Sequence, residues 1–166
     1  MKNNIKLFIS EIKGIWTDGC FYIDSKGNEF IKFNYNDLTG IDLLRRTGID
    51  FLLISADKNL AEEKAVEKIS LLNFKNDLKN KEKFIADYLK KNNIKWEETA
   101  YIGSTKDDLN LLKKVGLSAT PVSAPFYVKN IARWTMRRGG GEGVFSEFVE
   151  DYLEEVGLLK KSLFLD

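Results

Sequence analysis

Polar side chains that could do chemistry stand at the ends of short apolar runs in this sequence. Glu11 and Lys13 follow the first run, and Ser55 and Asp57 close a later one. The chain has no histidine and one cysteine, Cys20. This excludes Ser-His-Asp and Cys-His machinery, histidine metal ligands, an internal disulfide and a cysteine zinc site. Chemistry is left to carboxylates, hydroxyls, lysines, arginines and backbone dipoles.

The composition bounds the class of protein. The chain has 166 residues, 43% of them hydrophobic, so we expect a single domain over residues 1–166 with a core of its own. Its 26 Lys+Arg and 25 Asp+Glu nearly cancel, which argues against nucleic-acid and membrane-surface binding. No apolar run approaches the ~18 residues of a spanning helix, and no signal-peptide pattern is visible. We therefore expect a cytoplasmic protein without a nucleic-acid or membrane partner.

Strand and helix patterns alternate along the chain. Apolar runs typical of buried strands cover residues 5–9, 51–55, 71–74 and 100–102, and helical periodicity covers residues 38–47, 59–69, 80–91, 105–115 and 144–156. Two further apolar stretches flank a turn at Gly27, which predicts a hairpin. The alternation predicts a mainly parallel sheet between two helix layers, an α/β fold of three layers. Ligands of such folds bind at the carboxyl ends of the strands.

The segments at those ends resemble the motifs of one family. Residues 6–19, KLFISEIKGIWTDG, resemble the first motif, D-x-D-G-V-x-T-D-G, of the haloacid dehalogenase (HAD)-like phosphatases. The likeness is to their 3-deoxy-D-manno-octulosonate (KDO) 8-phosphate phosphatase branch, whose relatives accompany acylneuraminate cytidylyltransferases. Residues 53–57, 79–81 and 101–109 resemble the second, third and fourth motifs, and residues 140–143 resemble the C-terminal G-G-R-G.

The resemblance runs to about residue 153 and implies the fold. It implies a Rossmann-like HAD fold with a small β-hairpin flap at about residues 20–33 in place of a large cap. A C-terminal helix and tail are expected at about residues 144–166. The family's known assembly implies a homotetramer formed through the flap hairpins.

The resemblance also implies catalytic roles. Glu11 stands at the position of the family's nucleophilic aspartate, and Lys13 stands at that of its general acid/base. Ser55 stands at the phosphate contact of the second motif, and Lys81 is the lysine of the third. Glutamate is one methylene longer than aspartate, and lysine, with an ordinary pKa of ~10.4, is a poor general acid.

Substrate and metal positions are altered as well. The family's arginines are replaced here by Asn36, Asp57 and Glu142, and its fourth-motif metal aspartate is replaced by Ser104. An anionic substrate would meet carboxylates where it needs guanidinium groups. We expect no metal, and the carboxylates that could still bind one are Glu11 and Asp108. Without a metal, Glu11 is expected to pair with Lys13 and Lys81 in a salt-bridge cluster.

Two main functions follow from this set of residues, and a third option is a binding module for a neutral or cationic small molecule in the crevice. The first is a catalytically impaired HAD pseudophosphatase that acts as an oligomeric scaffold or regulatory module in sugar-acid or nucleotide-sugar metabolism. Its partners would be further copies of itself and a nucleotide-sugar pathway enzyme. The alternative is an active Mg²⁺-dependent phosphatase for a nonulosonate or KDO-type sugar phosphate.

Several of these residues also have structural interpretations. Thr105 and Asp108 have the spacing of a capping box. The glycine-rich residues 139–143 could form a turn or a subunit contact rather than an anion cradle. Arg133 beside Trp134 is typical of a basic strand edge at a surface, and Cys20 is expected to be a small buried residue beside the hairpin.

Overall fold

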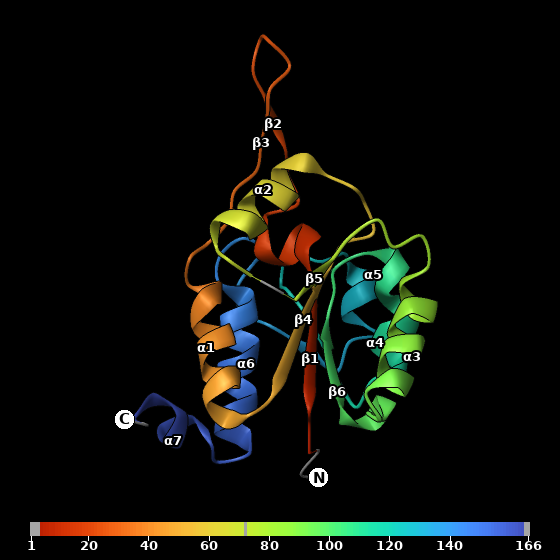
Figure 1. Cartoon of the computed structure of the whole chain (residues 1–166), viewed down its shortest axis with the longest axis vertical. Helices are drawn as coiled ribbons and strands as arrows, with labels where there is room; N and C mark the ends of the chain where they lie inside the picture. The colour runs from red at the N-terminus through yellow and green to blue at the C-terminus, as the bar shows by residue number, and fades with distance from the viewer. Residues whose placement is uncertain (1–3, 72, 165–166) are drawn as a thin grey trace.

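Parallel strands form the centre of the molecule (Figure 1). The computed structural model describes residues 4–71 and 73–164. In this part of the chain the larger sheet has six strands in the order β5-β4-β1-β6-β7-β8, and each neighbouring pair is parallel. Their bounds are β1 (Leu7–Glu11), β4 (Asp50–Ile54), β5 (Phe74–Lys75), β6 (Thr99–Ile102), β7 (Leu117–Thr120) and β8 (Trp134–Thr135).

Side chains of the central strand β1 enter two apolar cores, one on each face of the sheet. Leu7 and Ile9 belong to one core, and Phe8 belongs to the other, because successive side chains of a strand point to opposite faces. The Phe8 ring lies 5.1 Å from that of Phe148 and 5.3 Å from that of Tyr152, measured between centroids. Burial on both faces explains why the strands are nearly continuous apolar runs.

Helices cover both faces, as the three-layer prediction required. In Figure 1, α1 and α6 cover one face, and α3, α4 and α5 cover the other. The bounds are α1 (Asp37–Thr47), α2 (Leu60–Lys68), α3 (Lys81–Lys91), α4 (Leu109–Lys114), α5 (Phe126–Lys129), α6 (Val144–Glu155) and α7 (Leu159–Leu163). Short irregular helical turns are η1 (Ile12–Trp16), η2 (Trp96–Glu98) and η3 (Lys106–Asp108). Among the described helices, none is both long and apolar enough to cross a bilayer.

The predicted hairpin projects from the end of the molecule at which β1 and β4 finish (Figure 1). Its paired strands, β2 (Tyr22–Ile23) and β3 (Glu29–Phe30), are two residues long and antiparallel. The turn between them depends on Gly27, at φ 82°, and on the Asp24 carboxylate, which accepts hydrogen bonds from the backbone of Lys26 and Asn28. The hairpin is therefore a small flap.

Some elements differ from the sequence prediction. The strand expected at residues 71–74 is β5, which begins at Phe74, and Leu72 lies outside the described residues. The strands β7 and β8 and the helices α5 and α7 were not predicted as such, because they are short and their apolar residues show no clear period. Cys20 is exposed, so the prediction of a buried thiol is wrong; it lies on the segment that leads into the projecting hairpin rather than in either apolar core.

Candidate functional site

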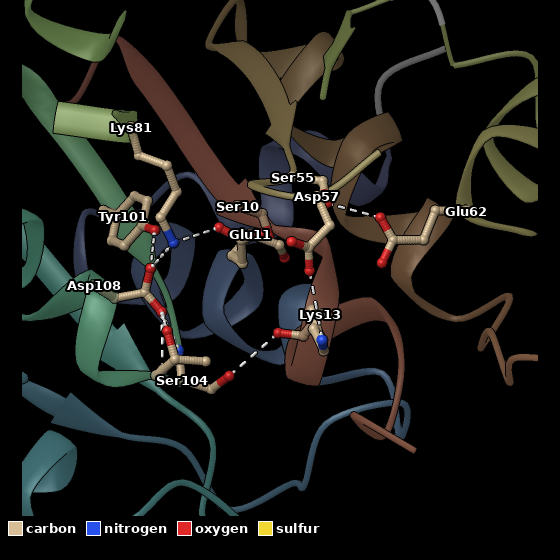
Figure 2. A network of polar contacts seen from close by, with 11 residues as sticks. Ser10, Glu11, Lys13, Ser55, Asp57, Glu62, Lys81, Tyr101, Ser104 and Asp108 are labelled. Atoms are coloured by element: carbon tan, nitrogen blue, oxygen red, sulfur yellow. Dashed lines mark hydrogen bonds and ion pairs between the residues drawn. The ribbon is translucent and has the colours of Figure 1, made fainter. Parts of the chain in front are cut away.

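The polar residues of the candidate site lie at the carboxyl ends of three neighbouring strands, β1, β4 and β6. Glu11 is the last residue of β1, Ser55 follows β4, and Ser104 lies two residues beyond β6. Because these strands are parallel, their carboxyl ends meet at one edge of the sheet, below the hairpin. Figure 2 shows the polar network formed there.

A buried ion cluster forms the centre of this network. The Lys81 ammonium lies 2.7 Å from Glu11 Oε2 and 2.5 Å from Asp108 Oδ1 (Figure 2). Glu11 is 3% exposed, Lys81 8% and Asp108 0%. The Tyr101 hydroxyl donates to the same Asp108 oxygen at 2.6 Å. The predicted pairing of Glu11 with Lys81 is confirmed.

Burial and mutual charge set the ionisation of this cluster. Burial raises the pKa of Glu11 to about 7, against the opposing effect of the Lys81 ammonium. Burial also opposes ionisation of Asp108, but Lys81 and the hydrogen bonds to its oxygens keep the pKa of Asp108 below its ordinary value. The two carboxylates outweigh burial at Lys81 and raise its pKa. Lys81 and Asp108 are therefore a fixed charge pair, and Glu11 is the member that titrates near neutral pH.

The second oxygen of Asp108 holds the loop after β6. Asp108 Oδ2 accepts hydrogen bonds from the backbone N–H of Ser104 and of Thr105, both at 2.9 Å, and from the Thr105 hydroxyl at 3.0 Å. This matches the capping interaction predicted for Thr105 and Asp108. Gly103 is required here, because a Cβ atom on it would lie 2.6 Å from the Asp108 carboxyl carbon. Since protein donors occupy both carboxylate oxygens, Asp108 positions the loop and Lys81.

Lys13 does not pair with Glu11, and that part of the cluster prediction is wrong. The strand ends at Glu11, and the chain then turns through η1, where Gly14 has φ 75°. The alternation expected of a strand no longer applies, and the Lys13 ammonium instead lies 3.5 Å from Asp57 Oδ2. Both side chains are more than half exposed, so this pair crosses the open part of the crevice (Figure 2).

Ser55 is bound to a residue that the sequence analysis did not assign to the site. Its hydroxyl donates to Glu62 Oε2 at 2.7 Å, and Glu62 is 6% exposed. Burial raises the pKa of Glu62, and the charge of Asp57 raises it further. Asn59 and Glu62 have the spacing of a capping box at the start of α2, and the Glu62 backbone N–H donates to Asn59 Oδ1 at 2.9 Å. The sequence signal for Glu62 was ambiguous, because its backbone N–H belongs to the helix cap while its carboxylate accepts the hydrogen bond from Ser55.

Asn36 and Glu142, the other positions altered from family arginines, make hydrogen bonds of their own outside the Lys13–Asp57 pair. Asn36 precedes α1 and is exposed. The Glu142 carboxylate accepts the backbone N–H of Gly139 at 2.9 Å and so closes its own loop. That loop lies against η1, where Gly141 donates its N–H to the Ile15 carbonyl at 2.8 Å. Of the three altered positions, Asp57 is the one in the crevice network.

Comparison with known proteins identifies the family. No family model matches the chain. The chain is 30% identical over 161 residues to the KDO 8-phosphate phosphatase KdsC of Haemophilus influenzae, covering 97% of this chain and 88% of that protein.

This chain belongs to the KDO 8-phosphate phosphatase branch of the HAD superfamily.

Solved structures agree with this assignment. A HAD superfamily (subfamily III A) hydrolase from Legionella pneumophila has a TM-score of 0.89 at 27% identity, with 98% of this chain and 89% of that one covered. The cobalt-bound form of the H. influenzae KDO 8-phosphate phosphatase has a TM-score of 0.85 at 28% identity, with 99% and 95% covered. The Rossmann-like HAD fold is confirmed.

A second group of relatives is longer. The chain is 31% identical over 163 residues to the N-acylneuraminate cytidylyltransferase A of Danio rerio, covering 95% of this chain but 36% of that protein. It therefore spans about a third of the length of these cytidylyltransferases. A HAD domain of this kind thus resembles both free-standing phosphatases and part of a larger enzyme.

The expectation that no metal is involved is wrong for this family. The H. influenzae structure holds cobalt, and a Moraxella catarrhalis KDO 8-phosphate phosphatase, which shares the fold with a TM-score of 0.88, was solved with magnesium, phosphate and KDO. In the described part of this chain, no three His, Cys, Asp or Glu side chains gather as a metal site. The chain does offer three hard oxygens: the Glu11 carboxylate, the Lys13 carbonyl and the Ser104 hydroxyl, the last two 3.2 Å apart.

In chemical type, these oxygens suit a divalent cation such as Mg²⁺. This ion binds oxygen, uses as few as one or two protein carboxylates, and keeps several waters. Serine hydroxyls serve as Mg²⁺ ligands in other phosphate-binding sites. With one carboxylate where the family motif has two, the site carries less negative charge, and its affinity for the ion should be lower.

Proposed function

We propose that this chain is a metal-assisted phosphomonoesterase for a KDO- or nonulosonate-type sugar phosphate, with a turnover far below that of a site built on aspartates. The observation that carries the proposal is the buried cluster of Glu11, Lys81 and Asp108 at the strand ends. It keeps a carboxylate at the nucleophile position, with a lysine held against it. The names of the free-standing relatives support the substrate class.

Residue roles follow from this geometry. The Glu11 carboxylate would attack phosphorus and displace the sugar alkoxide, forming an acyl phosphate that water then hydrolyses. Lys81, fixed by Asp108, would stabilise negative charge on the transferring phosphoryl group. Ser55 would donate its hydroxyl to a phosphoryl oxygen on leaving Glu62. A bound metal ion would supply further neutralisation of the phosphoryl oxygens.

Low turnover follows from the same residues. The extra methylene of Glu11 displaces the attacking oxygen by roughly 1 Å, an error that can cost on the order of 10²-fold. Lys13, at the acid/base position, is a poor proton donor to a leaving alkoxide near neutral pH. The Lys13–Asp57 pair must also open before a phosphate enters.

A second candidate is a non-catalytic scaffold or regulatory module. Four exposed apolar residues of the flap favour it: Phe21, Tyr22, Ile23 and Phe30. A hairpin with so much exposed apolar surface is suited to contact other copies, as in the homotetramer that the family resemblance implies. The relation to cytidylyltransferases suits a cytoplasmic partner enzyme of a nucleotide-sugar pathway. The comparisons support the phosphatase better than this candidate.

Phosphate release decides between the two candidates. The full chain is assayed with KDO 8-phosphate, a nonulosonate 9-phosphate and p-nitrophenyl phosphate, each with Mg²⁺ or Co²⁺. The matched control is Glu11→Gln, which removes the nucleophile with little change in size. Metal-dependent release that disappears in the control supports the phosphatase. Release no faster from the natural chain than from Glu11→Gln, for every substrate and metal, would reject it in favour of the scaffold.

A further inference from the structure

A cavity of about 240 Å³ lies between the flap hairpin and the ends of β1 and β4. Two hairpin side chains, Phe21 and Ile23, form an apolar wall, and both are more than 60% exposed. The remainder of the wall carries four charged side chains, Lys13, Glu29, Asp57 and Glu62. A concave site with an apolar wall and a few convergent polar groups is the usual form of a small-molecule site.

The charge of this cavity is the reverse of what a plain sugar phosphate requires. Glu29, Asp57 and Glu62 are acidic, whereas Lys13 is the cation among the cavity residues that the structure describes. The carboxylates act on one another: burial and the charges of Asp57 and Glu29 raise the pKa of Glu62, against the Ser55 hydrogen bond and Lys13, which lower it. A ligand that brings only negative charge would add to this repulsion. A ligand that also brings a positive charge would relieve it.

Geometry allows such an exchange. The Lys13–Asp57 pair is 3.5 Å long with both side chains more than half exposed, so it is weak and can open at little cost. A ligand ammonium can replace the Lys13 ammonium at Asp57 and leave Lys13 free for an anionic group. Glu29 is held over the cavity, because its Oε1 accepts a hydrogen bond from Asn59 at 2.9 Å. Phe21 also lines the cavity, and an aromatic ring can add a favourable contact to a cation.

We propose that this cavity selects a sugar phosphate that carries an amino group, with the ammonium among Glu29, Asp57 and Glu62 and the anionic end toward Lys13. The proposal rests on the proposed function only in taking the ligand to be a phosphate ester. It names Asp57 and Glu29 as residues that determine specificity.

Titration calorimetry on the full chain tests the preference with two probes that differ in one group, glucosamine 6-phosphate and glucose 6-phosphate. We expect the amino sugar to bind at least about threefold more tightly, the size of a partly exposed charge pair. The double variant Asp57→Asn/Glu29→Gln should reduce this ratio to about one. The control is Glu67→Gln, which removes an exposed carboxylate from the same helix as Glu62 but outside the cavity and should leave the ratio unchanged.

Three results would overturn the proposal: equal or weaker binding of the amino sugar, a preference that survives the double variant, or no binding of either probe at millimolar concentration. Circular dichroism of the double variant shows whether it is folded, and Asp57→Asn alone serves if it is not. Phosphate release is not measured here. An absence of turnover would therefore count against the proposed function and leave the amine preference standing.

Discussion

Each charge in the central cluster has a definite partner. Lys81 contacts Glu11 and Asp108, and Asp108 receives hydrogen bonds from four donors besides Lys81. Glu11 lacks such a set of donors, so its charge depends mainly on Lys81. The cluster thus combines a rigid pair with one carboxylate whose ionisation can change.

Removing the lysine should be costly. Lys81→Met keeps the length of the side chain but leaves two buried carboxylates without their cation. We expect the free energy of unfolding to fall by about 3–5 kcal/mol, the usual effect of breaking a buried pair from one side. Urea denaturation at pH 7 measures this. Lys64→Met, at an exposed pair with Glu67, is the control and should change it far less, because water screens this pair. Similar losses in both variants would contradict the importance assigned to the cluster.

Restoring the family's aspartates should restore chemistry. In Glu11→Asp/Lys13→Asp/Ser104→Asp, the attacking oxygen, the proton donor and the second metal carboxylate are all supplied. We expect phosphate release from KDO 8-phosphate with Mg²⁺ to rise by on the order of 10²-fold or more. The matched control, Glu11→Asn with the same two other changes, should remain inactive. A triple variant no faster than the natural chain would show that the crevice itself no longer accepts the substrate.

At the scale of elements, a buried carboxylate joins α1 to α6. Asp37, in the first turn of α1, accepts the backbone N–H of Phe145 at 2.9 Å and of Ser146 at 3.1 Å, at the start of α6. Its other oxygen, Oδ2, is buried without a hydrogen-bond partner. Burial raises the pKa of Asp37 to about 7 from an ordinary 3.8, against the hydrogen bonds and Arg138, which lower it. The two helices are therefore held by a group that prefers to be protonated.

This contact predicts a pH dependence of stability. Since the folded state binds the Asp37 proton more tightly than the unfolded chain, the contribution is complete below about pH 4 and is lost as pH rises toward 7. Each unit between the two pKa values corresponds to about 1.4 kcal/mol. Asp37→Asn should flatten the curve of unfolding free energy against pH over this range, measured by urea denaturation. The control Asp42→Asn, at a half-exposed side chain of α1, should leave the curve unchanged. Identical slopes in the natural chain, Asp37→Asn and Asp42→Asn would refute the role assigned to Asp37.

Sequence patterns predicted the elements better than their contacts. The buried runs and helical periods gave β1, β4, β6 and the long helices, because burial on both faces demands apolar residues at known spacings. The position of Glu62 and the pairing of Lys13 with Asp57 could not be predicted. Both depend on where η1 leaves the strand direction and on where α2 begins after β4. These are tertiary effects that no local spacing records.

At the scale of the whole molecule, the two edges of the sheet and the hairpin differ in what they offer to other chains. The edge strands β5 and β8 are two residues long and expose little unpaired backbone. The flap, in contrast, carries the exposed apolar residues Phe21, Ile23 and Phe30. Association between copies should therefore occur through the flap.

Light scattering after size exclusion tests this route of association. We expect a mass of about four times 19.0 kDa for the natural chain, reduced toward that of one chain in Phe21→Ser/Ile23→Ser/Phe30→Ser. The matched control is Val122→Ser/Phe126→Ser/Tyr127→Ser, which removes a comparably exposed apolar set in and just before α5. It should keep the larger mass. A natural chain that elutes as a monomer would argue against the homotetramer.

The central place of β1 also has a consequence for how the chain folds. Leu7 pairs with Asp50 on one side and with Thr99 on the other, so both neighbours of the first strand are synthesised after it. Contacts between residues so far apart in the sequence form slowly. The apolar residues of β1 therefore stay unpaired on that side until β6 (Thr99–Ile102) has also left the ribosome. An interval in which the chain is prone to aggregate, or in need of a chaperone, thus follows from the residue order of the strand that ends at Glu11.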